Sequence, residues 1–476
     1  MLSGDRHLQV PSLKPITDRP AFADVVAYNS FSYQLTFDPD AARAPTKYVC
    51  SGLPAGLTCN ATTGLISGTP TQTGDFTVLV TLSNSAGAAD TVQDTFSVFK
   101  YPAGAVGVYA GVMGRDTKAN SNLGGRIDLT TTITGGYTGT LRLGATAYPL
   151  NGTLRTAPAA GAHPGVTVNI ARTGKLPVVL VLDIDPATND LTGTVSEQGS
   201  STHAMIVGWR NVWHMTATPT ANPVVGQLGA HSFKIDPATT GPQGYGYGTV
   251  NVTNTGGTTV GGRTADGEVI ATTGVLGPDG EVLVYSMLYI SKGSILGTMG
   301  IESDANHSIA STLDWQKTQA TTARDYAPFG PLNVAVLGGK YSVTTPLLQL
   351  PSLSLTVTDN AQFTFSDAGL PSATNPNMNL RISNTNVLTL NPTNPGKINS
   401  LVFTPTTGAF GGKMILTDPP ALPRTVAFQG WLVPTLGKGY GYFLLPQLAN
   451  PLATPPTTAT TSPILSGKVL LEAVTR

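Results

Sequence analysis

Oxygen-bearing side chains gather in one short segment that could bind a hard cation. Asp183, Asp185, Asn189 and Asp190 lie within eight residues of one another, around Pro186. Carboxylate and amide oxygens in a turn are calcium ligands, so calcium is the one cofactor that the sequence suggests. The segment lacks the glycine and the final glutamate of an EF-hand loop. An Asx-rich hairpin turn, in which the same side chains cap backbone amides, is the simpler interpretation.

Aromatic side chains on expected strands could provide a second kind of site, a platform on which sugar rings stack. An aromatic ring combines a flat apolar face with large contact area, which suits the apolar face of a sugar. The same residues could instead fill a core or line a barrel, and both interpretations stay open. The candidates are Trp209, Trp213, Trp315, Trp431, Tyr440 and Tyr442.

Acidic residues that are far apart in the sequence could form the carboxylate pair of a glycoside hydrolase if the fold brought two of them together. The candidates are Asp128, Asp266, Glu268, Glu302 and Asp314. The sequence contains no nucleophile elbow of a serine hydrolase, no zinc-protease helix motif, no P-loop and no dinucleotide fingerprint. A non-catalytic protein is therefore favoured over an enzyme.

The two cysteines, Cys50 and Cys59, are separated by eight residues across an expected turn. No histidine follows them at the spacing of a zinc site. Two interpretations remain, a disulfide across the turn and a pair of buried thiols. A disulfide would favour an oxidising compartment.

The composition excludes several partners. Only 11% of the residues are charged and the formal net charge is zero, whereas about a quarter of residues are charged in typical domains. No run of Lys and Arg suits a phosphate backbone, so we expect no nucleic-acid partner. No apolar stretch is long enough for a transmembrane segment. Met1 to Lys14 is polar and lacks the apolar core of a signal peptide, so we expect that a native signal is absent from this sequence or has been removed.

The first hundred residues alternate between short strands and turns, which is typical of a β-sandwich. Along Phe76 to Leu82 the apolar side chains fall mainly on one face. The turn motifs are Gly52-Leu53-Pro54-Ala55-Gly56-Leu57-Thr58, Asn60-Ala61-Thr62-Thr63-Gly64, Ile66-Ser67-Gly68-Thr69-Pro70 and Ser83-Asn84-Ser85-Ala86-Gly87. In order and spacing they resemble the Ig-like (cadherin-like) domains of bacterial surface proteins. The resemblance implies a secreted or cell-surface location and a role as a spacer or adhesion module.

After Tyr101 the sequence becomes rich in glycine and contains a divergent repeat. Its copies begin at Thr134-Gly135-Gly136, Thr255-Gly256-Gly257 and Thr407-Gly408-Ala409. A second glycine-centred strand is expected in each copy, at 191–195, 295–299 and 465–469. Glycines at matching places in successive strands favour curved antiparallel meanders that form barrels or sandwiches. This region is similar to glycine-rich β modules of large secreted proteins of environmental bacteria, which have no established activity.

These patterns predict an all-β protein with an N-terminal Ig-like sandwich. The expected divisions are an extension (1–14), the sandwich (15–100), a first glycine-rich barrel or sandwich (101–218), a linker (219–239) and a larger glycine-rich domain (240–476). The function that we expect is non-catalytic adhesion, assembly or glycan binding, with a polysaccharide or another surface protein as partner. A secreted glycoside hydrolase is the alternative, and a self-assembling coat or filament subunit is a second one.

Overall fold

The computed structural model describes residues 25–35, 45–84, 89–155, 163–216, 220–322, 324–342, 350, 353–370, 377–393, 397–417 and 423–474. Within these ranges the chain forms strands and two short 3₁₀ helices, η1 (Ala103–Ala105) and η3 (Pro434–Leu436), and it has no α-helix. The expected all-β fold is confirmed. The expected N-terminal extension, 1–14, lies outside the described residues.

The N-terminal unit is the expected Ig-like sandwich, in which a sheet of order β1-β7-β6-β3 faces a sheet of order β2-β5-β4. Val78, Val80 and Leu82 alternate with more exposed residues along β6 and enter the core between the sheets. The strands are β1 (Val25–Val26), β2 (Phe31–Gln34), β3 (Lys47–Ser51), β4 (Leu57–Cys59), β5 (Leu65–Gly68), β6 (Gly74–Ser83) and β7 (Ala89–Phe99).

The first barrel follows and is a nearly closed antiparallel meander of order β11-β10-β9-β8-β15-β14-β13-β12. Its first strand, β8, pairs with its eighth, β15, and the meander stays open between β11 and β12. Its strands are β8 (Gly107–Met113), β9 (Gly125–Thr131), β10 (Gly136–Leu143), β11 (Thr146–Thr153), β12 (Gly165–Arg172), β13 (Lys175–Ile184), β14 (Asp190–Glu197) and β15 (Ala204–Arg210).

The second barrel repeats this topology with the order β19-β18-β17-β16-β23-β22-β21-β20. We call the gap between its edge strands, β19 and β20, the open seam. Its strands are β16 (Gly229–Ile235), β17 (Gly246–Val252), β18 (Gly257–Arg263), β19 (Val269–Val275), β20 (Glu281–Leu288), β21 (Gly293–Gly300), β22 (Ile309–Lys317) and β23 (Phe329–Lys340).

The third barrel has the order β26-β25-β24-β31-β30-β29-β28-β27, so it is open between its third and fourth strands instead of its fourth and fifth. Its strands are β24 (Ala361–Asp367), β25 (Met378–Ile382), β26 (Leu388–Leu390), β27 (Lys397–Thr404), β28 (Ala409–Leu416), β29 (Arg424–Val433), β30 (Lys438–Pro446) and β31 (Ile464–Ala473).

The divisions expected after residue 218 need correction. Residues 240–476 form parts of two separate eight-stranded sheets, and β16 lies inside the expected linker, 219–239. The reason is that each barrel closes by pairing its own first and last strands, β16 with β23 and β24 with β31. The sequence pattern did not reveal which strands make these long-range pairs.

The turns of the predicted repeat have the same local structure, but the copies do not occupy the same position in their barrels. In each copy a glycine with positive φ, at Gly135, Gly256 and Gly408, lies against an aromatic ring, which leaves no room for a Cβ. The rings belong to Tyr101, Trp213 and Tyr341 respectively. The first two turns connect the second and third strands of their barrels, but the third connects β27 and β28, the fourth and fifth. The glycine-centred strands that follow are β14, β21 and β31, which do not occupy equivalent positions.

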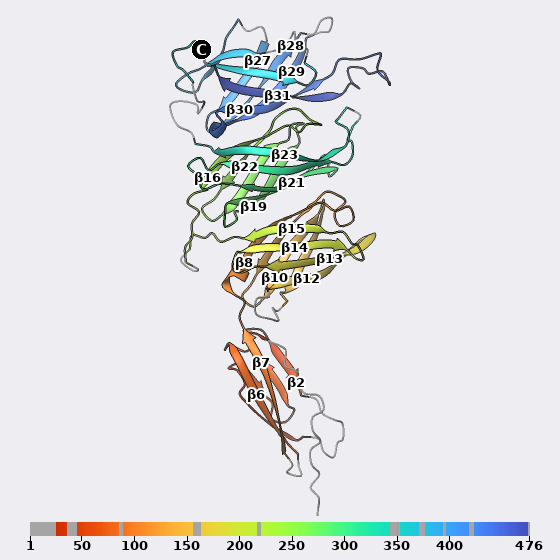
Figure 1. Ribbon diagram of the computed structural model, residues 1–476, viewed down its shortest axis with the longest axis vertical. Helices are drawn as coiled ribbons and strands as arrows, with labels where there is room; N and C mark the ends of the chain where they lie inside the picture. The colour runs from red at the N-terminus through yellow and green to blue at the C-terminus, as the bar shows by residue number, and fades with distance from the viewer. Residues whose placement is uncertain are drawn as a thin grey trace, which may run out of the picture.

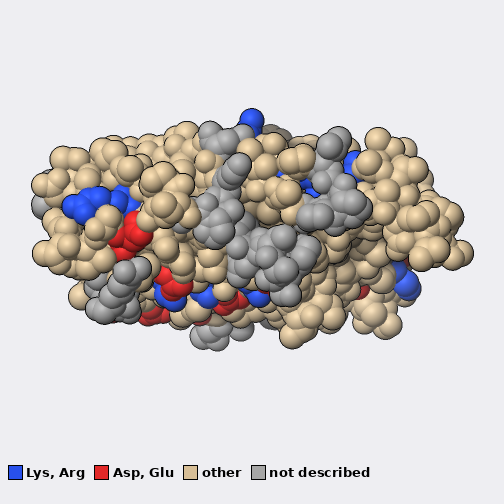
Figure 2. All heavy atoms as spheres, turned by 90° about the horizontal axis from the view of Figure 1, so that it is seen from above, with Lys and Arg blue, Asp and Glu red and all other residues tan. Residues whose placement is uncertain are grey.

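The four units are arranged in a line, with the sandwich at one end and the third barrel at the other (Figure 1). Seen from the end with the third barrel, the visible surface is mainly uncharged, with scattered basic and acidic side chains (Figure 2). No helix of the described residues is long and apolar enough to span a membrane.

Candidate binding groove between the first two barrels

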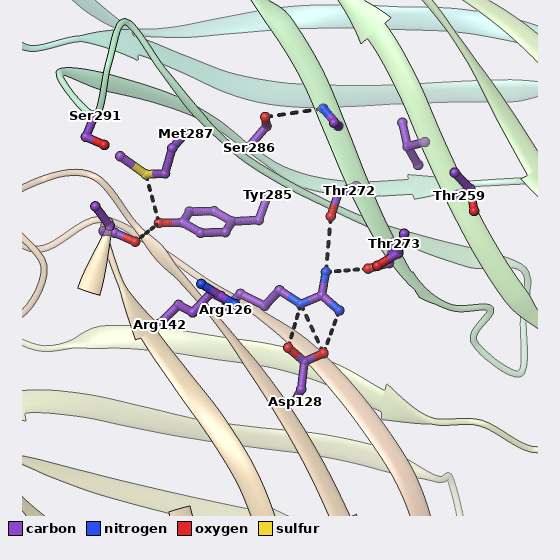
Figure 3. A pocket seen from close by; sticks show the side chains of 14 residues that line it. Arg126, Asp128, Arg142, Thr259, Thr272, Thr273, Tyr285, Ser286, Met287 and Ser291 are labelled. Atoms are coloured by element: carbon purple, nitrogen blue, oxygen red, sulfur yellow. Dashed lines mark hydrogen bonds and ion pairs between the residues drawn. The ribbon is translucent and has the colours of Figure 1, made fainter. Parts of the chain in front are cut away.

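A groove of about 610 Å³ lies between the first and second barrels (Figure 3). Its volume is within the range of small-molecule sites. Strands β9 and β10 form one wall, and β18, β19 and β20 form the other. The polar side chains along it are Arg126, Asp128, Arg142, Thr259, Thr272, Thr273, Tyr285, Ser286 and Ser291.

Arg126 spans the groove from one barrel to the other. It shares the outward face of β9 with Asp128, because alternate residues of a strand point the same way, and its Nε donates to both carboxylate oxygens at 3.0 and 2.9 Å. Its Nη1 donates to Thr272 Oγ1 at 3.1 Å and to the carbonyl oxygen of Thr273. Both the charge and the donors of Arg126 are therefore engaged by protein groups.

Arg142 is a second cation in the groove, and it has no such partners. It lies directly opposite Arg126 in the register of β9 and β10. Its side chain is exposed and makes no hydrogen bond or ion pair with any described residue. Asp128 neutralises Arg126, so the positive charge of Arg142 is not neutralised by a groove-lining residue.

The open seam supplies backbone groups to the groove. The antiparallel ladder with β18 leaves the odd-numbered residues of β19 with their backbone groups directed outward. Side chains cap some of these groups: Ser286 Oγ accepts from the Ala271 N–H at 3.3 Å, and Arg126 donates to the Thr273 carbonyl. The Ala271 carbonyl and the Thr273 N–H have no partner among the described residues, so they can bond a ligand.

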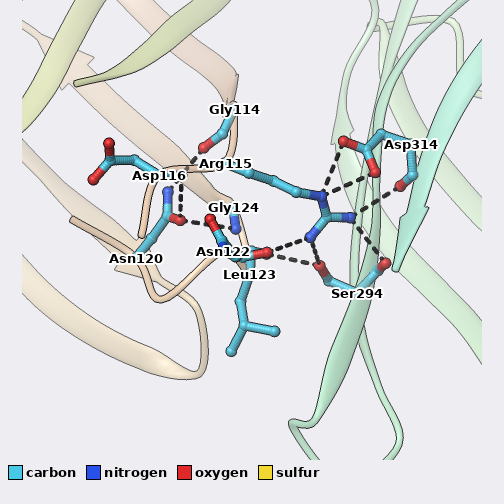
Figure 4. A network of polar contacts seen from close by, with 9 residues as sticks. All are labelled: Gly114, Arg115, Asp116, Asn120, Asn122, Leu123, Gly124, Ser294 and Asp314. Atoms are coloured by element: carbon cyan, nitrogen blue, oxygen red, sulfur yellow. Dashed lines mark hydrogen bonds and ion pairs between the residues drawn. The ribbon is translucent and has the colours of Figure 1, made fainter. Parts of the chain in front are cut away.

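An ion pair with a buried arginine fixes the two walls relative to each other (Figure 4). Arg115, in the loop after β8, donates from Nε to both carboxylate oxygens of Asp314 at 2.9 Å. Its Nη atoms donate to Oγ and the carbonyl oxygen of Ser294, at 2.6 and 3.1 Å. The Arg115 side chain is only 8% exposed. A charge-assisted network of this kind is directional, so it holds the barrels in one orientation.

Apolar packing and a tyrosine strengthen this contact. Trp209 and Val112 of the first barrel pack against Leu283 and Leu296 of the second. The hydroxyl of Tyr285 donates to the Gly144 carbonyl at 2.9 Å. Burial raises the pKa of Tyr285, so the hydroxyl keeps its proton and remains a donor. The groove is thus preformed between two docked barrels.

The aromatic side chains that were candidates for a sugar platform do not line the groove. Trp209, Trp315, Tyr440 and Tyr442 are buried, and Trp213 and Trp431 are half-buried. The indole of Trp209 donates to the Val275 carbonyl at 2.8 Å, and that of Trp213 donates to the Gly277 carbonyl at 3.3 Å. These two therefore attach the first barrel, and the segment that follows its last strand, to the second barrel.

The other four fill the second barrel and its contact with the third. The ring of Tyr247 lies 5.8 Å from that of Trp431 and 6.1 Å from that of Tyr442, and Tyr440 packs on Tyr245 at 5.1 Å. Trp315 is inside the second barrel. The four buried rings therefore fit the alternative interpretation, in which these residues fill cores and contacts between barrels.

The expected calcium ligands have other partners. Asp183 accepts from His163 and Arg155, and Asn189 Oδ1 accepts from Arg210. Asp185 caps the Ala187 N–H at 2.8 Å, and this hydrogen bond is the main cause that lowers the pKa of Asp185. The Thr188 hydroxyl donates to Asp190 at 2.7 Å. Within the described residues, no group of three His, Cys, Asp or Glu is arranged to hold a metal ion.

The two cysteines are joined in the structure. A disulfide links Cys50 in β3 to Cys59 in β4, with their Cα atoms 6.0 Å apart. It lies within the Ig-like sandwich and connects one of its sheets to the other.

The acidic residues that could serve a glycosidase do not converge on the groove. Asp314 is bound by Arg115, and only Asp128 lines the groove. Asp266 and Glu268 share a cavity of about 100 Å³ near the third barrel. Burial raises the pKa of Asp266, which accepts from Tyr289 at 2.7 Å.

Sequence reasoning missed the arginines of the groove. Arg126 and Asp128 share one strand face, a signal that the sequence contains. Nothing local, however, indicates that Arg142 lies opposite Arg126 or that β19 lies across from both.

A family model described as "Putative Ig domain" matches residues 14–99. These residues are an Ig-like domain. No curated protein matches the sequence.

Among solved structures, a double mutant of the vaccine antigen transferrin binding protein B from Haemophilus parasuis Hp5 is 13% identical, with 84% of each chain covered and a TM-score of 0.21. The human desmocollin-1 ectodomain is 10% identical, with 88% of this chain and 79% of that chain covered and a TM-score of 0.16. These TM-scores are too low to indicate a shared fold.

Proposed function

We propose that this chain is a non-catalytic extracellular adhesion protein that binds saccharide in the groove between its first two barrels. The observation that carries the proposal is the groove itself, a polar hollow of about 610 Å³ between two docked barrels. The Ig-like domain and the low charge support a location outside the cytoplasm. Because the four units lie in a line, the groove is between two middle units and not at either end of the molecule (Figure 1).

The groove favours binding over hydrolysis. Glycoside hydrolases generally use two carboxyl groups on either side of the scissile bond. Asp128 is the one carboxylate among the groove-lining residues, and Arg126 holds both of its oxygens. Threonine and serine hydroxyls and free backbone groups of β19 suit the hydrogen bonding of sugar hydroxyls instead.

A glycan array tests this proposal with a variant that fills the groove. Thr259→Trp places a large ring on an exposed position of β18 in the groove, and we expect it to abolish saccharide binding. Thr425→Trp, on an exposed position of β29 in the third barrel, is the matched control and should bind as the wild type does. Equal binding by all three proteins would overturn the groove as the site. Shortened oligosaccharide products after incubation would show a hydrolase instead.

A further inference from the structure

The charges in the groove do not balance, although the whole chain has a formal net charge of zero. Arg126 and Arg142 contribute two positive charges and Asp128 contributes one negative charge. Arg115, which lies in the contact beside the groove, is paired with Asp314. Arg142 therefore offers an unneutralised guanidinium to whatever enters the groove.

Like charges directly opposite on neighbouring strands are unfavourable. Arg142 and Arg126 are such a pair. Asp128 and the second barrel compensate Arg126, but nothing in the described residues compensates Arg142. A bound anion would remove this repulsion as well as satisfy the donors of Arg142.

The remaining lining matches a ligand with many hydroxyl groups. Thr259 and Ser291 are exposed in the groove, and no described residue pairs with the Thr273 N–H or the Ala271 carbonyl at the open seam. The one aromatic ring there, Tyr285, is 6% exposed, so stacking on a flat ring contributes little. Recognition must then depend on charge and hydrogen bonds, which selects acidic saccharides over apolar-faced neutral ones.

From this arrangement we propose that the groove binds negatively charged saccharides of the uronate type, with Arg142 as the residue that binds their carboxylate. The inference rests on the proposed function and names its ligand class. A guanidinium presents two parallel donors that match the two oxygens of a carboxylate. The threonine hydroxyls and the edge of β19 bind the sugar hydroxyls beside it.

Calorimetric titration with trigalacturonate, its neutral methyl ester and a sulfated galactan fragment tests this proposal. We expect the wild type to bind trigalacturonate and to bind the methyl ester at least about tenfold more weakly, since a charge-assisted hydrogen bond is lost. Arg142→Gln should lose this preference, and Arg142→Lys should retain part of it. Lys413→Gln removes an exposed charge from the third barrel and is the matched control, with no change expected.

The outcomes separate this inference from the proposed function. Equal binding of the ester and the acid, blocked by Thr259→Trp, would overturn the uronate inference and leave saccharide binding intact. Failure of every saccharide would overturn both. A preference for the sulfated fragment would show that Arg142 reads sulfate, and tighter binding of an oligoglutamate peptide would show a protein ligand; either result contradicts the uronate assignment.

Discussion

His231 is the residue that most clearly links stability to pH. It lies in β16 with no exposed surface, and burial, helped by the nearby charge of His307, lowers its pKa from 6.5 to about 4. The unfolded imidazole takes up a proton below about pH 6.5, whereas the folded one stays neutral until about pH 4. The contribution of His231 to stability is therefore fully present above pH 6.5 and decreases as the pH falls toward 4, by up to about 3 kcal/mol.

Urea unfolding at about pH 7 and about pH 4.5 measures this loss. His231→Gln and His231→Phe should each reduce the difference between the two pH values. His203→Gln, at an exposed histidine, should leave it unchanged. If the variants at His231 lose as much stability on acidification as the wild type, the buried imidazole is not its cause.

Gly256 shows why the repeated turn requires glycine. Its φ is +77°, and a Cβ there would lie 2.5 Å from a ring atom of Trp213. Gly256→Ala should therefore cost about 1 to 3 kcal/mol of unfolding free energy. Gly261→Ala is the matched control, because its φ is not in the left-handed region and nothing lies within 4 Å of its Cβ position. Comparable thermal stability of both variants would contradict the tight contact with Trp213.

At the scale of the elements, the contact between the first two barrels depends on an ion pair whose arginine is buried. Arg115→Met leaves Asp314, which is 27% exposed, without its cation, and we expect a loss of about 2 kcal/mol in chemical denaturation, less than for a fully buried pair. Lys438→Met is the control, because its ion pair with Glu472 is 41% and 30% exposed, and such pairs contribute at most about 1 kcal/mol. Arg115→Met together with Asp314→Leu should recover much of the loss. A small effect of Arg115→Met would show that apolar packing alone docks the barrels.

The sequence predicted the strands and turns better than it predicted which strands pair. Alternation along Phe76 to Leu82 and the turn motifs around Gly52 and Gly64 were enough for the sandwich, because strand faces and turns are local properties. Glycine spacing likewise predicted curved meanders. The pairing of β16 with β23 joins residues about a hundred positions apart. The open seam lies between two consecutive strands, β19 and β20, and their sequences do not show that they stay unpaired.

The candidate site illustrates the same limit. Most of the candidate aromatic residues are buried in a barrel or in the contacts between barrels. A single sequence does not distinguish such residues from those of a ligand platform. The position of Arg142 opposite Arg126 follows only from the strand register.

At the scale of the whole molecule, the groove exists because the barrels are docked. The first barrel supplies the cations and the second supplies the strand edge, so neither barrel alone contains the site. The Ig-like domain contacts the first barrel through Asn29, which donates to the Thr134 carbonyl at 2.7 Å. It thus continues the line of barrels at the end away from the third barrel.

Hydrogen exchange of individual backbone amides, with and without the tightest-binding oligosaccharide of the array, tests the groove most directly. The Thr273 N–H faces the open seam and has no acceptor among the described residues, so it should exchange quickly. We predict that the ligand slows its exchange, with further protection in β9 and β10 and none in the third barrel. Protection confined to the third barrel or the sandwich, with Thr273 unchanged, would contradict the assignment of the groove as the binding site.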